Sequence, residues 1–146
     1  MIAGMDGHRV RLNLVLGVVL AVLTLAVYAP VREFFFLNFD DNAYVVENAH
    51  ISQGLSQANV AWSLTAFVNG NWHPLTLLSH MLDVQIFGLN PAGHHLENLA
   101  LHVINVLLLF WLLAGMTRQS WPSAFVAALF AVHPLNIETV AWIAER

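Results

Sequence analysis

Two adjacent carboxylates, Asp40 and Asp41, form the motif with the clearest chemical potential in this sequence. Several aromatic residues surround them: Phe34, Phe35, Phe36, Phe39 and Tyr44. Asp and Asn are also common in turns, so the pair Asp40-Asp41 taken alone favours a solvent-exposed loop. The aromatic neighbours would hold the acids near a membrane surface, where desolvation raises the pKa of a carboxyl group and favours general-base catalysis. We therefore predict that Asp40 and Asp41 are catalytic residues.

Two His-Pro strings are the next candidates for chemistry. One is Asn71-Trp72-His73-Pro74 and the other is His133-Pro134-Leu135-Asn136-Ile137-Glu138. Each His-Pro pair lies at a predicted helix boundary, where a histidine can end a helix and a proline sets the turn. The functional interpretation makes His133 and Glu138 a ligand or proton-relay pair that faces the acids of the first loop.

Three further histidines, His94, His95 and His102, are best explained by hydrogen bonds between helices. A haem would need two axial ligands at one depth, and His102 has no evident partner in the third apolar segment. The sequence also contains no glycine-rich phosphate loop, nucleophile elbow or zinc-ligand spacing.

The composition is that of a membrane protein. The 146 residues are 58% hydrophobic and 10% charged, whereas roughly a quarter of an ordinary soluble domain is charged. There is no cysteine, which excludes a disulfide framework and a thiolate zinc site. The formal net charge of −4 argues against a nucleic-acid partner, because no basic stripe is present to neutralise phosphates.

The predicted fold is all-α and polytopic, with about three transmembrane helices. Arg9, Arg11 and Arg118 place the N-terminus and one turn in the cytoplasm by the positive-inside rule. A signal peptide is the alternative for the first span, but Pro30 opposes cleavage after Ala29. The boundaries that we predict are a cytoplasmic N-terminus (1–11), a first span (12–29), an outer loop (30–93), a second span (94–114), a cytoplasmic turn (115–120) and a third segment (121–144).

Two amphipathic helices are expected in the outer loop, along the membrane surface. Ser56 can cap the first, which carries Val60, Leu64 and Phe67 on one stripe. Pro74 suits the first turn of the second, and Gly88 can end it. Leu75, Leu78, Leu82 and Ile86 form an apolar stripe on this second helix, and Thr76, His80 and Asp83 fall on its other face.

Two features suggest partner helices that these spans alone do not supply. The second span carries a polar stripe of His95, Asn98, His102 and Asn105, which must face protein or a water-filled cavity. Pro134 interrupts the third segment, so that either one helix is kinked there or the chain breaks and leaves His133 and Glu138 at the outer surface. We therefore expect a fragment of a larger bundle, a truncated gene product.

Taken together, the motifs resemble one family over nearly the whole chain from about Leu12. The strings that carry the resemblance are Phe39-Asp40-Asp41, Asn71-Trp72-His73-Pro74-Leu75-Thr76, Ser79-His80-Met81-Leu82-Asp83, Phe87-Gly88-Leu89-Asn90-Pro91-Ala92-Gly93-His94-His95 and His133 to Arg146. They look like the start of bacterial type-C (GT-C) membrane glycosyltransferases with C-terminal tetratricopeptide repeats. These are similar to the transmembrane and tetratricopeptide-repeat protein O-mannosyltransferases of animals.

The resemblance implies a multi-pass protein of the bacterial cytoplasmic membrane that acts in protein glycosylation. The donor would be a polyprenyl-phosphate sugar in the lipid bilayer, and the acceptor a hydroxyl group of a protein or glycan on the outer face. Asp40 and Asp41 match the acidic pair of the family's first outer loop, and His133 and Glu138 match its second outer-face motif. Family members continue with more membrane helices and the repeats, so we expect this fragment to be inactive alone.

Glycosyl transfer passes through an oxocarbenium-like state, in which a carboxylate can deprotonate the acceptor and stabilise positive charge. The departing phosphate needs a cation, either Arg32 or a divalent metal (Mg²⁺ or Mn²⁺) for which Asp40, Asp41 and Glu138 are candidate ligands. His73 and His80 are candidates for residues that support this catalytic site. The alternatives are a non-catalytic membrane anchor or assembly module, and a redox or ion-conducting subunit that uses the histidines.

Overall fold

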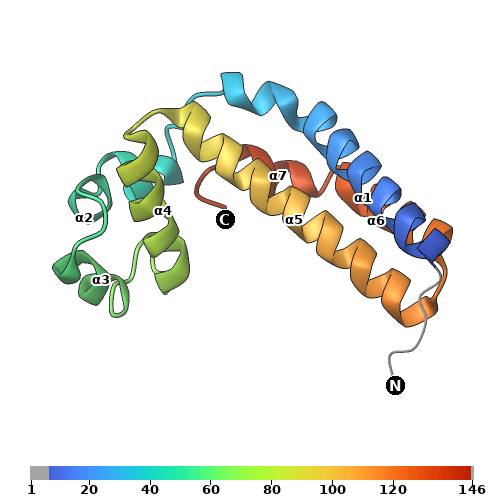
Figure 1. The fold of residues 1–146 in the computed structure, drawn as a ribbon. Coiled ribbons are helices and arrows are strands. Elements are labelled where there is room, and N and C mark those ends of the chain that lie inside the picture. The colour runs from blue at the N-terminus through green and yellow to red at the C-terminus, as the bar shows by residue number, and fades with distance from the viewer. Residues whose placement is uncertain (1–6, 146) are drawn as a thin grey trace. The chain divides into compact units, whose positions relative to one another are not determined.

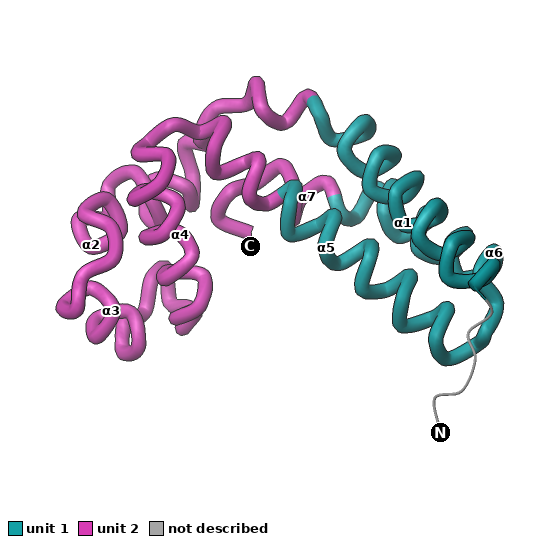
Figure 2. The backbone as a smooth tube through the Cα atoms, in the orientation of Figure 1, with its two compact units in different colours: residues 1–29, 99–136 teal, residues 30–98, 137–146 magenta. Residues whose placement is uncertain are grey.

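The computed structural model describes residues 7–145, and in this range the chain is α-helical with one isolated β-bridge, between Val68 and Asn71. The all-α prediction is confirmed. Residues 1–6, which belong to the predicted cytoplasmic N-terminus, and Arg146, which ends the last motif, lie outside the described residues. The chain divides into two compact units, residues 1–29 with 99–136 and residues 30–98 with 137–146 (Figure 2).

The first unit is built from helix α1 (Gly7–Tyr28), most of helix α5 (Pro91–Thr117) and helix α6 (Ser120–Val132). Helices α1 and α6 lie side by side (Figure 1). Alanines on α6 allow this close approach, because small residues let helix backbones come together. The buried core of the unit consists of Leu16, Leu20, Val106, Phe110, Ala114, Ala124, Ala127 and Ala131.

Two helices are long and apolar enough to cross a membrane. They are residues Gly7–Glu33, which include the 3-10 turn η1 (Ala29–Glu33), and Pro91–Thr117, each of 27 residues. Only 33% and 28% of their most apolar windows are buried. A core helix of a soluble protein would be mostly buried, so this exposed apolar surface is the pattern expected for contact with lipid.

The third predicted segment does not form one long helix. Helix α6 ends at Val132 after 13 residues, and helix α7 (Asn136–Ala141) begins beyond Pro134. At about 1.5 Å per residue α6 is roughly 20 Å long, short of the roughly 30 Å of a hydrocarbon core. Proline lacks the N–H that would continue the helix and forces the preceding residue out of helical geometry, and His133 is extended. Of the two alternatives for residues 121–144, a kinked helix or a break at Pro134, the structure has the break.

The second unit contains most of the predicted outer loop. Its elements are the π-helix η2 (Asn42–Val46), helices α2 (Ala49–Ser52), α3 (Gln57–Ser63) and α4 (Pro74–Phe87), the first turns of α5, and α7. The buried apolar residues that hold these elements together are Tyr44, Val45, Ile51, Ala66, Leu77, Met81, Ile143 and Ala144.

Helices α3 and α4 lie in the region of the two predicted loop helices, whose place on a membrane surface stays a prediction. The Ser56 hydroxyl oxygen accepts a hydrogen bond from the Asn59 N–H at 3.1 Å and caps α3. Helix α3 ends at Ser63, so the predicted stripe is wrong for Leu64 and Phe67, which lie beyond it. Gly88 ends α4 with a positive φ of 62°, a conformation that glycine adopts without strain.

Helix α4 buries its polar face. His80 and Asp83 are fully buried, whereas Leu75, Leu82 and Ile86 of the apolar stripe are exposed. An apolar stripe turned outward suits a helix that lies on a membrane, and this location stays a prediction. Along α5, three residues of the predicted polar stripe are buried, and the fourth, Asn105, is exposed.

The predicted topology can be tested with two glutamines that are both exposed in the structure, Gln53 and Gln119. Gln53→Cys should react with a membrane-impermeant thiol reagent in intact cells, because it lies in the predicted outer loop. Gln119→Cys should react only after the membrane is opened, because it lies in the predicted cytoplasmic turn. Labelling of Gln119→Cys alone in intact cells would invert the topology.

Candidate functional site

The two acids of the first loop have different surroundings. Asp41 is fully buried, and both its carboxylate oxygens accept backbone hydrogen bonds. The Leu37 N–H donates to Oδ2 at 2.8 Å, and the Ala144 N–H donates to Oδ1 at 2.9 Å. Hydrogen bonds to an ionised acceptor are stronger than neutral ones. Asp41 therefore joins the acidic loop to the segment that follows α7.

Asp40 is partly exposed and makes a single side-chain hydrogen bond among the described residues. The Asn69 amide donates to its Oδ1 at 2.8 Å. Asn69 lies in the turn closed by the bridge between Val68 and Asn71, and the Tyr44 hydroxyl donates to the Val68 carbonyl at 3.2 Å. The turn therefore holds Asp40 near the surface of the unit while leaving it accessible.

An open apolar hollow lies close to the acidic loop. Its volume is about 270 Å³, and its walls are Phe34, Leu37, Ile137, Glu138, Ala141 and Trp142. The Trp142 ring also contacts the ring of Phe39, the residue before Asp40, with centroids 6.0 Å apart. One wall residue, Glu138, belongs to the predicted second motif. The structure thus places Glu138 in the wall of a hollow to which Phe34 and Leu37, from the segment before Asp40, also contribute.

Three other predicted site residues, Arg32, His73 and His133, lie at surfaces. Arg32 is exposed and pairs with exposed Glu33 at 3.5 Å, a contact of little energetic value in water. His73 is exposed at the N-cap of α4 and makes no capping bond. His133 belongs to the first unit, and its Nδ1 accepts a hydrogen bond from the Leu135 N–H at 3.3 Å. This contact gives His133 the helix-end role that is the structural alternative for the His-Pro strings.

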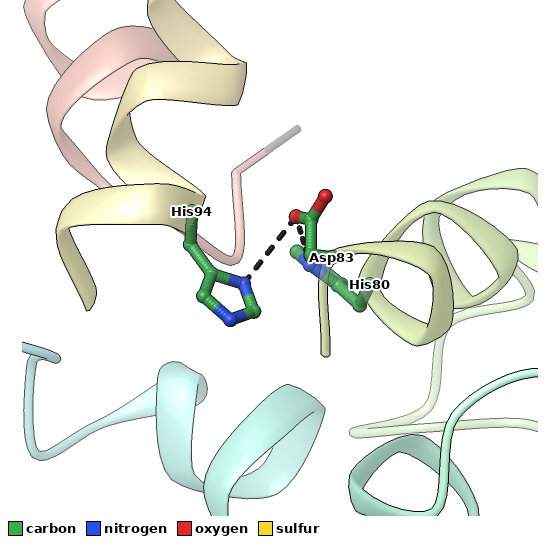
Figure 3. Close-up of side chains that lie close together, drawn as sticks. All are labelled: His80, Asp83 and His94. Atoms are coloured by element: carbon green, nitrogen blue, oxygen red, sulfur yellow. Dashed lines mark ion pairs between the residues drawn. The ribbon is translucent and has the colours of Figure 1, made fainter. Parts of the chain in front are cut away.

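A different group of residues converges inside the second unit. Helix α4 contributes His80 and Asp83, which are three positions apart and share a face, and the first turn of α5 contributes His94 (Figure 3). All three side chains are fully buried. Asp83 Oδ2 lies 3.3 Å from His94 Nδ1 and 3.9 Å from His80 Nδ1.

These three residues are the only ones in the described range that gather closely enough for three His, Cys, Asp or Glu side chains to share an ion. Asp40, Asp41 and Glu138 form no such group. Sequence reasoning selected His80 only for support, treated His94 as a helix-packing residue and did not select Asp83. The signal available was the spacing of His80 and Asp83 on one helical face.

The chain is homologous to animal TMTC proteins. It is 30% identical over 115 residues to "Protein O-mannosyl-transferase Tmtc1" and 34% identical over 116 residues to "Protein O-mannosyl-transferase Tmtc2", both of Drosophila melanogaster. It is 31% identical over 121 residues to "Protein O-mannosyl-transferase TMTC1" of Homo sapiens. These matches cover 73–74% of this chain.

The same matches cover only 12–13% of the length of those relatives. No family model matches the sequence, and no solved structure matches it. The resemblance inferred from the motifs is thus confirmed as homology to the TMTC O-mannosyltransferases, whose names support a glycosyltransferase-like function.

The hydrogen bonds of Asp41 predict a difference between the two acids in stability. Asp41→Asn places an NH₂ group against one of two backbone donors and should lower the free energy of unfolding by about 1.5–3 kcal/mol. Asp40→Asn, at a partly exposed position, should lower it by no more than about 0.5 kcal/mol. Denaturant and thermal unfolding of the detergent-solubilised variants measure this. Equal losses for both would contradict a structural role specific to Asp41.

Proposed function

We propose that this chain is the amino-terminal part of a membrane glycosyltransferase that transfers a sugar to an acceptor hydroxyl group, with Asp40 as the catalytic base. The observation that carries the proposal is the difference between the two acids. Asp41 has both oxygens engaged by backbone donors and fixes the loop, whereas Asp40, beside it, is accessible and close to an apolar hollow. The printed names of the relatives support mannose as the sugar and a protein as the acceptor.

The chemistry assigned to Asp40 is proton abstraction. The carboxylate takes the proton of the acceptor hydroxyl as that oxygen forms a bond to the anomeric carbon, and the bond from this carbon to the donor phosphate breaks. Positive charge that develops on the sugar ring is stabilised by the nearby carboxylate. The hydrogen bond from Asn69 orients Asp40 without removing its charge.

A polyprenyl-phosphate donor suits the surface around Asp40. The walls of the hollow are mostly aromatic and aliphatic, which fits the apolar part of such a lipid. Nearby aromatic side chains are strongly exposed, among them Phe35 at 81% and Phe39 at 72%. Exposed aromatic residues are typical of the boundary between lipid and water. We therefore propose that this part of the loop lies at a membrane surface, where it meets the donor. The predicted topology makes it the outer surface, and the motif resemblance makes the membrane a bacterial cytoplasmic one.

The departing phosphate still needs positive charge. Arg32 is the one arginine of the predicted outer loop 30–93, and it is exposed. The proposed Mg²⁺ or Mn²⁺ set of Asp40, Asp41 and Glu138 does not fit well, because the three do not gather and both oxygens of Asp41 already accept backbone bonds. Arg32, or groups in the further membrane helices expected of the full-length protein, would then supply the charge.

The full-length protein, with tetratricopeptide repeats after its membrane helices, is the expected active form, and this chain alone is expected to be inactive. The alternative function is a non-catalytic anchor or assembly module. The burial of polar residues such as Asn98, whose amide donates to the Trp142 carbonyl at 3.0 Å, would serve that role equally well.

Replacement of Asp40 distinguishes a glycosyltransferase from a non-catalytic anchor or assembly module. In membranes that carry the full-length protein, Asp40→Asn should lower mannose transfer from a polyprenyl-phosphate donor by about 10²–10⁴-fold, because the general base is lost. The transfer of radiolabelled mannose to an acceptor peptide measures this. Glu47→Gln is the matched control, since Glu47 is an exposed acid of the same loop, and it should transfer at the normal rate. Normal transfer by Asp40→Asn would contradict the assignment.

A further inference from the structure

We infer that His80, Asp83 and His94 form a binding site for a first-row divalent transition metal such as Zn²⁺. This site is separate from the acids assigned to glycosyl transfer and does not depend on that function. It joins helix α4 to the start of helix α5, the two elements from which its side chains come (Figure 3).

The hydrogen bonding of His94 determines which of its nitrogens can bind a cation. Its Nε2 lies 3.0 Å from the Gly88 carbonyl oxygen. A carbonyl can only accept, so the proton of this contact is on Nε2. In a neutral imidazole, Nδ1 then carries a lone pair, and Nδ1 is the atom that faces Asp83. Ligating histidines commonly donate their other N–H to a backbone carbonyl in this way, which fixes the ring orientation.

The contact between His94 and Asp83 requires a metal ion or a proton between the two atoms. A lone pair on Nδ1 and a carboxylate oxygen lie 3.3 Å apart, with both side chains fully buried. Two acceptors facing each other in a buried site repel each other. A metal ion between them removes the repulsion, and so does a proton on either the ring or the carboxyl group. With a proton, the contact would be an ordinary ion pair or hydrogen bond.

The third group favours the metal ion. The Nδ1 atom of His80 lies 3.9 Å from the same oxygen, Asp83 Oδ2, so two imidazole nitrogens converge on one carboxylate oxygen. The candidate ligand atoms of the three residues all lie within 4.8 Å of one another. Metal–ligand bonds of about 2.0–2.1 Å at tetrahedral angles place ligand atoms about 3.3–3.4 Å apart. The 3.3 Å separation already matches this geometry, the 3.9 Å separation is close to it, and the remaining ligand atoms, within 4.8 Å, would have to move closer on binding.

The ligand types indicate the class of metal. Two imidazoles and one carboxylate suit zinc and iron, whereas magnesium and calcium prefer oxygen ligands. Three protein ligands also leave a coordination position for water or another group. The tight turn between the helices contributes to the geometry, because a methyl group at Gly93 would overlap the Phe87 ring. Close packing there brings His94 back toward the last turns of α4.

Metal binding by the detergent-solubilised protein tests this inference. After treatment with EDTA and reconstitution, the wild type should retain about one equivalent of Zn²⁺. Co²⁺ in its place should give the visible absorption of a site with nitrogen and oxygen ligands. Added Zn²⁺ should raise the melting temperature and EDTA should lower it, because a ligand that binds only the folded state stabilises it.

Substitutions locate the site. His94→Gln and Asp83→Asn should weaken Zn²⁺ binding by at least about tenfold, as even the loss of an outer partner of a metal ligand does. His50→Gln is the control: His50 is an exposed histidine in the same unit and outside the cluster, so this variant should bind as the wild type does. If a cluster variant fails to fold, the metal content and the Co²⁺ spectrum of the wild type show whether the protein binds the metal. A wild type that retains no metal and melts identically with EDTA, or cluster variants that bind normally, would overturn the inference.

Discussion

The buried carboxylate of Asp41 is the interaction on which the rest of the second unit depends. Residues 37 and 144 are far apart in sequence, and both present a backbone N–H to this one side chain. Without the carboxylate, the buried Ala144 N–H and the partly buried Leu37 N–H would lose this partner, and the loss is costly for the buried donor. The position of Asp40, the contact between Phe39 and Trp142 and the shape of the nearby hollow all follow from the join that Asp41 makes.

The second unit buries polar side chains beside its apolar core, and on helix α4 they share the inward face with Leu77 and Met81. Helix α4 turns His80 and Asp83 inward and leaves Leu75 and Ile86 exposed. This orientation is reasonable where the surroundings are partly apolar, because the outward stripe is then stabilised by lipid and the inward groups can satisfy one another. The same reversal explains why the side chains best arranged to bind an ion are inside the unit.

Much of the architecture could be predicted from sequence patterns, and the exceptions have physical causes. Ser56, Pro74 and Gly88 predicted helix ends because capping depends on neighbours in the sequence. The sequence left a kink and a break at Pro134 both open, because apolar composition continues past Pro134 although the helical backbone does not. The different surroundings of Asp40 and Asp41 could not be predicted, since Asp41 bonds to a residue 103 positions away. Asp83 was missed for a similar reason, because its partner His94 lies on another helix.

The end of helix α6 has a consequence for how the protein is made. The break leaves carbonyl groups without helical partners, and nearby side chains compensate: the Asn136 amide donates to the Phe130 carbonyl at 2.6 Å, and His102 Nε2 donates to the Ala131 carbonyl at 3.0 Å. Within a bilayer, such carbonyls must be paired by the protein itself. His102 belongs to α5, which leaves the ribosome before α6. The hydrogen-bond donor for the Ala131 carbonyl is therefore already present when α6 is made. In the multi-pass arrangement that the sequence predicts, helices α5 and α6 would therefore be inserted together, as a hairpin.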